Sequence, residues 1–235
     1  MPSSELTVSL NEQQRKAVET VEGPLLIVAG AGSGKTRVIT ARIARMLSGG
    51  ISEKNILALT FTNKAAREMR QRIAAAAGKK VKELTVSTFH AFGVQLLIHY
   101  GRLLGFEHNF TIYDEVDKTA LLKEVLRERG GTNEGINFYE LSRYISSVKL
   151  GRATASSVKP PDKLVIDYSE HLKAYNAFDF DDLIAMPLRL FAEHPEVLAE
   201  CRQKYSYILV DEFQDTSEAQ YKIIRTLAEE SRNKS

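Results

Sequence analysis

The sequence has little of what disulfide frameworks, cysteine metal clusters or membrane spans require. Its 235 residues include one cysteine, Cys201, no tryptophan and six prolines. A single cysteine excludes an internal disulfide, argues against a cysteine metal cluster and fits a reducing compartment. No apolar run approaches the roughly 20 residues of a membrane-spanning helix, and Met1–Ser9 lacks the apolar segment of a signal peptide. We therefore expect a cytoplasmic protein with no membrane partner.

The sequence also lacks a strong excess of positive or negative charge. Lys and Arg together number 32 and Asp and Glu number 30, so the formal net charge is only +2. A nucleic-acid-binding surface is therefore permitted, but it would have to be a local patch. The hydrophobic content of 43% and the charged content of 26% are ordinary for a globular protein, and the length allows one large domain or two small ones.

The sequence does contain an apolar run that breaks into a glycine-rich turn, LLIVAGAGSGKT at Leu25–Thr36. The spacing is that of a strand, a phosphate loop and a helix start, except that Ala29 replaces the first glycine. We expect the loop glycines to take positive φ, so that backbone N–H groups approach a phosphate closely. Lys35 can reach the β- and γ-phosphates, and the Thr36 hydroxyl can hold Mg²⁺. The alternative is a glycine-rich turn without a ligand. The residues expected to bind a nucleotide here are Ala29, Gly30, Ala31, Gly32, Ser33, Gly34, Lys35 and Thr36.

Apolar periodicity predicts alternating helices and strands around this loop. Asn11 with Gln14 three residues later has the pattern of a capping box, which predicts a helix to about Val21. We expect strands at 25–29, 56–60, 84–87 and 205–210, and helices at 34–48, 64–77 and 217–229. Strands that alternate with helices indicate an α/β fold with a parallel sheet.

The central part of the chain has a different pattern, because almost only helical periodicity is found between residues 91 and 204. We therefore expect two domains. Residues 1–91 and 205–235 form the α/β domain, and residues 92–204 form an inserted helical domain.

A second apolar strand ends in two acids, Asp211 and Glu212. In a phosphate-loop enzyme, Asp211 would hold Mg²⁺ together with Thr36, and Glu212 would orient or deprotonate the attacking water. The catalytic residues would then be Lys35, Asp211 and Glu212. An Asp-Glu pair after a strand is by itself more often a solvated turn, so the interpretation depends on the phosphate loop upstream.

The order of six segments resembles that of Rep/UvrD/PcrA-type superfamily 1 DNA helicases. These segments are Leu10–Gln14, Ala29–Arg37, Thr60–Ala66, Ser87–His90, Asp179–Leu183 and Val210–Thr216. The resemblance implies a RecA-like P-loop NTPase sheet with an inserted all-helical subdomain, and it implies ATP and Mg²⁺ as cofactors. It also implies a nucleoid-associated protein that moves 3′–5′ along single-stranded DNA.

The resemblance implies further site residues. Gln14 would read the adenine edge and Arg37 would contact the nucleotide, although the first could be a helix cap and the second a surface residue. The residues that would bind single-stranded DNA are Phe61, Thr62, Asn63, Thr88 and His90. For Phe61 the alternative is core packing, and for His90 it is a hydrogen-bonded structural histidine. The acids Asp179, Asp181 and Asp182 have local helix capping as their better explanation.

One departure from the family limits this interpretation. The second sheet domain, whose arginines complete the ATP site in such helicases, has no counterpart in these 235 residues. We therefore expect the N-terminal portion of a longer chain, with the missing C-terminal motor domain as a partner. One hypothesis is an ATP-driven helicase or translocase. The other is a truncated ATP- and single-stranded-DNA-binding module with negligible turnover.

Overall fold

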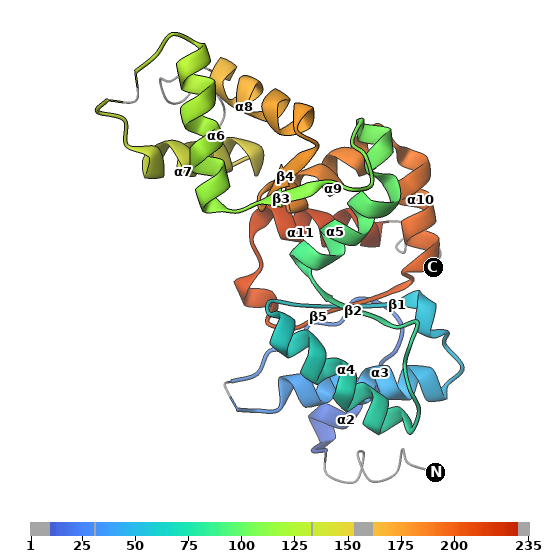
Figure 1. Ribbon diagram of the computed structural model, residues 1–235. Helices are drawn as coiled ribbons and strands as arrows, with labels where there is room; N and C mark the ends of the chain where they lie inside the picture. Colours follow the sequence, from blue (N-terminus) through green and yellow to red (C-terminus); the bar gives the residue numbers. More distant parts are fainter. Residues whose placement is uncertain (1–9, 31, 133, 153–161, 230–235) are drawn as a thin grey trace. The chain divides into compact units, whose positions relative to one another are not determined.

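A computed structural model describes residues 10–30, 32–132, 134–152 and 162–229. These residues divide into two compact units, which are described separately (Figure 1). The sheet unit comprises residues 1–89, 199–216 and 227–235, and the helical unit comprises residues 90–198 and 217–226. The domain boundaries expected from the sequence remain predictions.

The sheet unit is built on three parallel strands in the order β2-β1-β5. These are β1 (Ile56–Thr60), β2 (Thr85–Thr88) and β5 (Tyr207–Val210). All five residues of the central strand β1 are buried, as expected for a parallel strand. Leu59 is in register with Val210 and Thr60 with Thr88, so the three strands end together at one edge. Residues that follow these strands are thereby brought to a common edge.

Three helices of this unit lie on the same face of the sheet in Figure 1: α2 (Glu12–Glu19), α3 (Lys35–Ser48) and α4 (Asn63–Ala77). The predicted capping box is confirmed, because the Asn11 side chain accepts from the Gln14 N–H and the Gln14 side chain accepts from the Asn11 N–H. The helix α4 ends at Gly78, whose φ of 64° suits glycine. The buried core between helices and sheet contains Ile39, Ile43, Met46, Leu47, Ile56, Ala58, Ala66, Met69, Ile73, Val81, Leu84, Val86 and Leu209.

The strand expected at residues 25–29 is wrong in this structure. These residues form no ladder among the described residues, and Leu26 and Val28 are 71% and 87% exposed. A continuous apolar run predicts a strand with neighbours on both sides. Here the segment pairs with no described strand, and two of its large apolar side chains remain exposed.

The helical unit contains most of the remaining helices. Their bounds are α5 (Phe89–Tyr100), α6 (Glu115–Glu128), α7 (Phe138–Lys149), α8 (Asp162–Ala174), α9 (Asp182–Glu193), α10 (Pro195–Lys204) and α11 (Glu218–Ala228). The last residues of α10 and of α11 group with the sheet unit. Single turns of 3₁₀ helix lie at Glu53–Asn55, Gly101–Leu104 and Phe213–Asp215. None of the described helices is long and apolar enough to cross a membrane.

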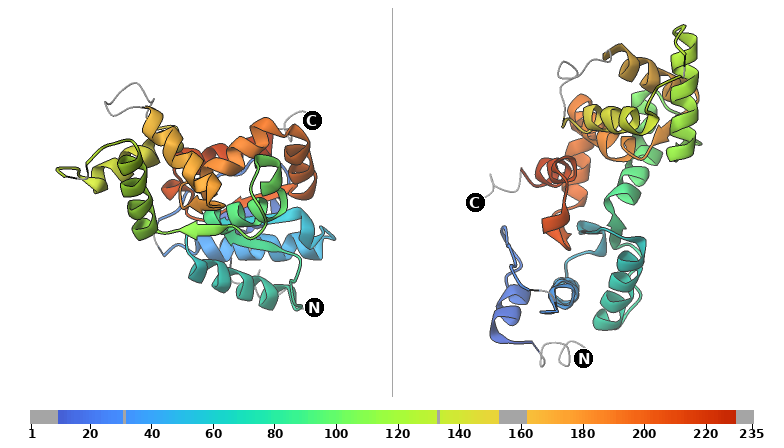
Figure 2. Two further views of the ribbon diagram at one scale, coloured as in Figure 1. Left: turned by 45° about the horizontal axis from the view of Figure 1, so that its top comes forward. Right: turned by 90° about the vertical axis from the view of Figure 1, so that its left-hand side faces the viewer.

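The expectation of an all-helical insert is wrong in one respect. Two short strands, β3 (Thr111–Tyr113) and β4 (Ala177–Asp179), pair in parallel within the helical unit. Three residues are too few to show the two-residue alternation by which a strand is predicted. Both views in Figure 2 show α6, α7 and α8 gathered at one end of this unit. Their core contains Leu121, Leu122, Val125, Leu141, Ile145, Leu164, Val165, Tyr168, Leu172 and Ala177.

Buried ion pairs join these helices to the turn after β4. The ammonium of Lys149 lies 2.8 Å from carboxylate oxygens of both Asp179 and Asp182, and that of Lys118 lies 2.8 Å from Asp181. The side chains of both lysines are at least 95% buried. The expectation of local capping is met only in part. Asp179 accepts from the Asp182 N–H, whereas Asp181, at the N-cap of α9, makes no side-chain cap.

The carboxylates of this cluster carry opposed pKa shifts. Burial raises the pKa of Asp182 to about 6, because Lys149 offsets the loss of water only in part. For Asp179, burial acts in the same direction, but the Lys149 and Lys118 ammonium groups and the bond from the Asp182 N–H together outweigh it and lower the pKa. One oxygen of Asp182, Oδ1, is buried without a partner. Lys149 is therefore the counter-charge on which both acids depend.

We predict that Lys149→Met destabilises the protein by about 3–5 kcal/mol, because it leaves two carboxylates buried without their cation. Urea denaturation followed by circular dichroism measures the change. The matched control is Lys222→Met, because Lys222 pairs with Glu218 at the surface, where a lost ion pair costs about 0–1 kcal/mol. Equal stability losses in the two variants would contradict the prediction.

Candidate functional site

The loop between residues 29 and 35 is a tight turn with two left-handed glycines. Gly32 and Gly34 have φ of 73° and 85°, as predicted, whereas Gly30 does not take positive φ, contrary to expectation. Both the N–H and the hydroxyl of Ser33 donate to the Gly30 carbonyl, at 3.3 and 2.6 Å, and this closes the turn. Ala31 lies outside the described residues. The turn leads directly into the N-terminus of α3, which is a favourable place for an anion.

Lys35 opens α3 and folds its side chain back over the turn. Its ammonium donates to the carbonyls of Ala29 and Gly30, at 3.1 and 3.3 Å. Carbonyl oxygens are neutral acceptors, and a phosphate oxygen is a stronger, charged one. The cation is thus held at the mouth of the loop by bonds that an anionic ligand can replace.

Thr36 brings the start of α3 to the end of β5. Its hydroxyl donates to Oδ2 of Asp211, at 3.2 Å, across 175 residues of sequence. Asp211 is 5% exposed, and its N–H donates to the Leu59 carbonyl of β1. Burial raises the pKa of Asp211, and Glu212 adds to this, while the Thr36 hydroxyl opposes it. A hydroxyl beside one carboxylate is a donor set that suits Mg²⁺, which takes few protein oxygens and completes its shell with phosphates and water.

Glu212 follows with an unusual backbone. Its φ of 52° lies in the left-handed region, which costs a non-glycine residue about 1–2 kcal/mol. The side-chain amide of Gln214 donates to its carboxylate, and the N–H of Glu212 donates to Asp211. The motif predicted Glu212 but not Gln214, whose only signal was its place two residues further along the same turn. These two hydrogen bonds hold Glu212 beside the Asp211 carboxylate in spite of the strained backbone.

Gln14 lies against the phosphate-loop turn. Its Nε2 donates to the Ser33 carbonyl at 2.9 Å, while its Oε1 accepts from the Asn11 N–H in the capping box. It borders a pocket of about 330 Å³. The pocket is lined by Asn11, Gln13, Gln14, Lys16, Ala17, Thr20, Leu25, Leu26, Ile27, Val28, Ala29, Ser33, Lys35 and Val38. Arg37 is exposed and is not among these lining residues. The structure thus brings Gln14 and Lys35 to one pocket.

A second hollow of about 330 Å³ lies at the strand ends. It is lined by Thr36, Thr60, Phe61, Thr62, Ala65, Glu68, Arg72, Asp211 and Glu212. The Phe61 ring is partly exposed and packs on Phe89, with centroids 5.9 Å apart. The hydroxyl of Thr62 accepts from the Ala65 N–H and caps α4, and Asn63 is exposed. The acid pair and the turn after β1 therefore share one hollow.

The other two residues expected to bind DNA lie in different surroundings. Thr88 is the last residue of β2 and is 7% exposed, and its strand ends level with Thr60. His90 is partly buried in the helical unit, where its ring meets the edge of the Phe180 ring at 6.1 Å. Burial lowers the pKa of His90, and the Asp181 carboxylate opposes that shift.

Comparison with known proteins identifies the family of the chain. Residues 10–234 match the family model described as the UvrD/REP helicase N-terminal domain. The chain belongs to this family. The ATP-dependent DNA helicase PcrA of Leuconostoc citreum is 41% identical over 97% of the chain, and the ATP-dependent DNA helicase Rep of Escherichia coli (strain K12) is 42% identical over 93%. PcrA of Staphylococcus aureus (strain Mu50 / ATCC 700699) is 40% identical over 95%.

This member of the UvrD/REP family spans only about a third of the length of the relatives it matches, namely 32%, 34% and 32% of the three. What those relatives do as whole proteins is therefore a proposal for this chain.

We predict that Asp211→Asn stabilises the ligand-free protein at pH 7 and abolishes the gain in nucleotide affinity that Mg²⁺ gives. Because the folded protein raises the pKa of Asp211, it favours the protonated acid, and this contribution to stability is lost as the pH rises through the folded pKa. The neutral amide avoids that loss, so the variant should be more stable than the parent at pH 7.

Thermal unfolding at pH 7 and at pH 4 measures the stability difference, which should shrink at the lower pH. Nucleotide titrations with and without Mg²⁺ measure the metal effect. A variant that is less stable than the parent at pH 7, or that keeps the full Mg²⁺ effect, would contradict the prediction.

Proposed function

We propose that this chain is the ATP-binding portion of a DNA helicase that moves 3′–5′ along single-stranded DNA. The observation that carries the proposal is that Lys35 and Thr36 meet Asp211, which lies 175 residues after Thr36 in the sequence. We further propose that residues 1–91 and 205–235 form a RecA-like first motor domain, and that residues 92–204 form its insert. Family membership supports both proposals.

Each residue of the site has a distinct role in the proposed ATP hydrolysis. The loop N–H groups and Lys35 bind the phosphates and orient the γ-phosphoryl group. Thr36 and Asp211 would hold Mg²⁺, which neutralises charge on the β- and γ-phosphates when bound. Glu212, fixed by its backbone and by Gln214, would orient the attacking water and take its proton.

Gln14 would provide the adenine contact. Its amide can donate and accept, which is what recognition of an adenine edge requires. Both ends of the amide are already engaged, with the Ser33 carbonyl and the Asn11 N–H. Adenine would therefore have to exchange bonds with the protein at this position. Arg37, exposed on the first turn of α3, would contact the nucleotide from outside the pocket.

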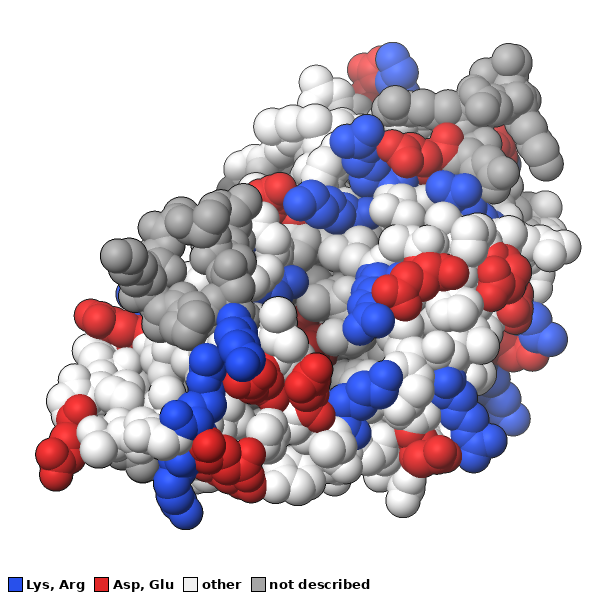
Figure 3. All heavy atoms as spheres, turned by 90° about the horizontal axis from the view of Figure 1, so that it is seen from above, with Lys and Arg blue, Asp and Glu red and all other residues white. Residues whose placement is uncertain are grey.

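Single-stranded DNA would bind along the ends of β1 and β2. Phe61 would stack on a base, and Thr62, Asn63, Thr88 and His90 would contact the backbone. The shared hollow that Phe61, Asp211 and Glu212 line supports coupling between DNA contact and hydrolysis. Basic and acidic side chains are interspersed over the face seen in Figure 3, and the net charge is +2. Affinity should therefore be modest and sensitive to salt.

For the nucleotide, we predict that Lys35→Ala weakens ATP·Mg²⁺ binding by at least about tenfold, because it removes a charge-assisted bond. Isothermal titration calorimetry of the parent and the variant measures this. Lys16→Ala is the control, because Lys16 also lines the pocket but belongs to α2 and not to the loop turn. Equal affinity of the parent and Lys35→Ala would refute the site.

For DNA, we predict that Phe61→Ala lowers the affinity for a single-stranded oligonucleotide, since stacking on one aromatic ring contributes about 1–3 kcal/mol. Fluorescence anisotropy with a labelled oligothymidylate at two salt concentrations measures it. Phe213→Ala serves as a control at another partly exposed phenylalanine, which should change affinity little. An unchanged affinity in Phe61→Ala would remove the stacking role.

For turnover, we predict that residues 1–235 on their own hydrolyse ATP very slowly and do not unwind DNA. The negative charge that spreads over the leaving phosphoryl group needs preorganised cations, and an arginine finger is worth about 10³–10⁵ in rate. The family relatives are three times as long and would supply such arginines from a second motor domain.

A coupled ATPase assay with and without single-stranded DNA tests this proposal. Glu212→Gln is the control for contaminating activity, because it should abolish any turnover that belongs to this site while sparing ATP binding. Robust DNA-stimulated turnover that Glu212→Gln removes would contradict the prediction. Binding of ATP and DNA without turnover favours the second hypothesis, a nucleotide- and DNA-binding module.

A further inference from the structure

Arg42 is a buried cation that the proposed chemistry does not use. It lies within α3 between the core residues Ile39 and Ile43, and it is 7% exposed. Its guanidinium donates to two backbone carbonyls, with Nη1 2.6 Å from the Ala17 oxygen and Nη2 3.1 Å from the Val21 oxygen. Burying a charged guanidinium among apolar core residues costs free energy. The burial of Arg42 and its two hydrogen bonds therefore need an explanation.

Both carbonyls belong to the end of α2. Ala17 lies in the last turn of that helix, whose final carbonyls have no partner within the helix, and Val21 lies just beyond it. The Arg42 guanidinium therefore closes the end of α2 and fixes the direction in which the chain leaves it. A cation at a helix C-terminus is also favoured by the helix dipole.

The helix α2 needs such an anchor. It has eight residues, of which only Val18 is buried, and a helix of this length is not stable by itself. At its N-terminus the capping box and the bond from Gln14 to Ser33 hold it. At its C-terminus the two bonds from Arg42 hold it, together with the packing of Val18 on Val38 and Ala41.

The position of α2 determines where the side-chain amide of Gln14 lies in the pocket. Gln14 and Ala17 are one turn apart on α2, and both line the pocket next to the loop turn. A rotation or shift of α2 would move the Gln14 amide, whereas the Lys35 ammonium is held by the carbonyls of Ala29 and Gly30, which lie outside α2. The base and the phosphates are therefore contacted from separate elements of the sheet unit, which the bonds from Arg42 to the end of α2 and from Gln14 to Ser33 connect.

We propose that Arg42 is a positioning residue that fixes α2 on α3 and thereby makes the pocket select adenine over guanine. This inference rests on the proposed ATP site and adds to it a determinant of base specificity that does not touch the nucleotide.

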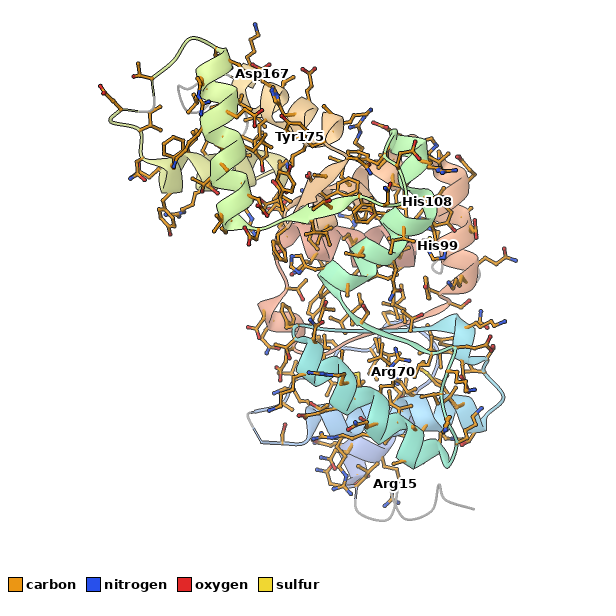
Figure 4. All side chains as sticks on the ribbon, in the orientation of Figure 1. Arg15, Arg70, His99, His108, Asp167 and Tyr175 are labelled. Atoms are coloured by element: carbon orange, nitrogen blue, oxygen red, sulfur yellow. The ribbon has the colours of Figure 1, made fainter. Side chains whose placement is uncertain are left out.

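A second arginine shows the same bonding without a link to the pocket. Arg70 of α4, labelled in Figure 4, donates to the carbonyls of Leu84 and Val86, at 2.9 and 3.2 Å. It fastens the beginning of β2, and it is not among the residues that line the pocket beside Gln14. Arg70→Met therefore removes an equivalent pair of bonds and reports what a purely structural loss does.

The test compares three ligands: ATP with Mg²⁺, GTP with Mg²⁺ and inorganic tripolyphosphate, which has phosphates but no base. In Arg42→Met we expect the ratio of ATP to GTP affinity to fall by about tenfold, the worth of one hydrogen bond, with tripolyphosphate affinity within about twofold of the parent. Arg42→Lys keeps the charge but not the planar fork and should give an intermediate ratio. Arg45→Met, an exposed arginine of the same helix, and Arg70→Met should keep the parent's ratio.

Each outcome decides. An unchanged ATP to GTP ratio in Arg42→Met overturns the inference, as does an equal loss of affinity for all three ligands or the same fall in ratio in Arg70→Met. If Arg42→Met does not fold, Arg42→Lys decides alone, and an unchanged ratio there overturns the inference. If the parent and Lys35→Ala bind ATP equally, the proposed ATP site itself fails, which is a distinct result.

Discussion

The hydrogen bond from Thr36 to Asp211 joins the two halves of the candidate site. It connects the first turn of α3 to the end of β5 across 175 residues, and no local preference of the chain could create it. It depends on the parallel register in which Leu59 of β1 lies beside Val210 of β5. Because β1 and β5 end at one edge, the acid pair and the turn after β1 are brought together there, and the Thr36 bond adds the start of α3. The chemistry proposed for the chain is thus a consequence of sheet pairing.

The helical unit depends on a different constraint, the burial of charge. Asp179, Asp181 and Asp182 lie where β4 turns into α9, and their counter-charges come from Lys118 on α6 and Lys149 on α7. A buried ion pair contributes little net stability, but removing one of its partners is strongly destabilising. These pairs therefore act mainly by specifying which elements pack together. The hydrogen bonding of the three carboxylates also differs, because one buried oxygen of Asp182, Oδ1, has no hydrogen-bond partner.

Local signals in the sequence predicted local structure well. The capping box of Asn11 and Gln14, the helix that ends before Gly49 and the buried strand β1 are all confirmed. The strand at 25–29 is wrong because an apolar run indicates burial without indicating a neighbour to pair with. The strands β3 and β4 were missed because a segment of three residues is too short to show the alternation of apolar and polar residues that predicts a strand. For the three acids, the sequence showed a capping pattern but could not show the lysines, which lie 30 or more residues away.

The sequence named candidate residues for the site but not the surroundings in which they lie. The motif named Lys35, Thr36 and Asp211, and the structure brings them together. It could not show that Glu212 takes a left-handed backbone, because that conformation is imposed by the turn into Phe213–Asp215. Nor could it show that Arg42 is buried on two carbonyls, although an arginine on the apolar face of a predicted helix, between Ile39 and Ile43, was a signal that could have been noted.

Two side chains expected to bind the nucleotide, Lys35 and Gln14, are already hydrogen-bonded within the protein, and this decides how a ligand can gain affinity through them. Lys35 is bonded to two carbonyls, and Gln14 is bonded to a third. For Gln14 a bond to adenine replaces one neutral bond by another, so the net gain is small. For Lys35 a phosphate replaces neutral carbonyls by a charged acceptor, which is a stronger bond. Phosphates would therefore supply most of the binding energy, and the base contact would act mainly by leaving a wrong base unpaired.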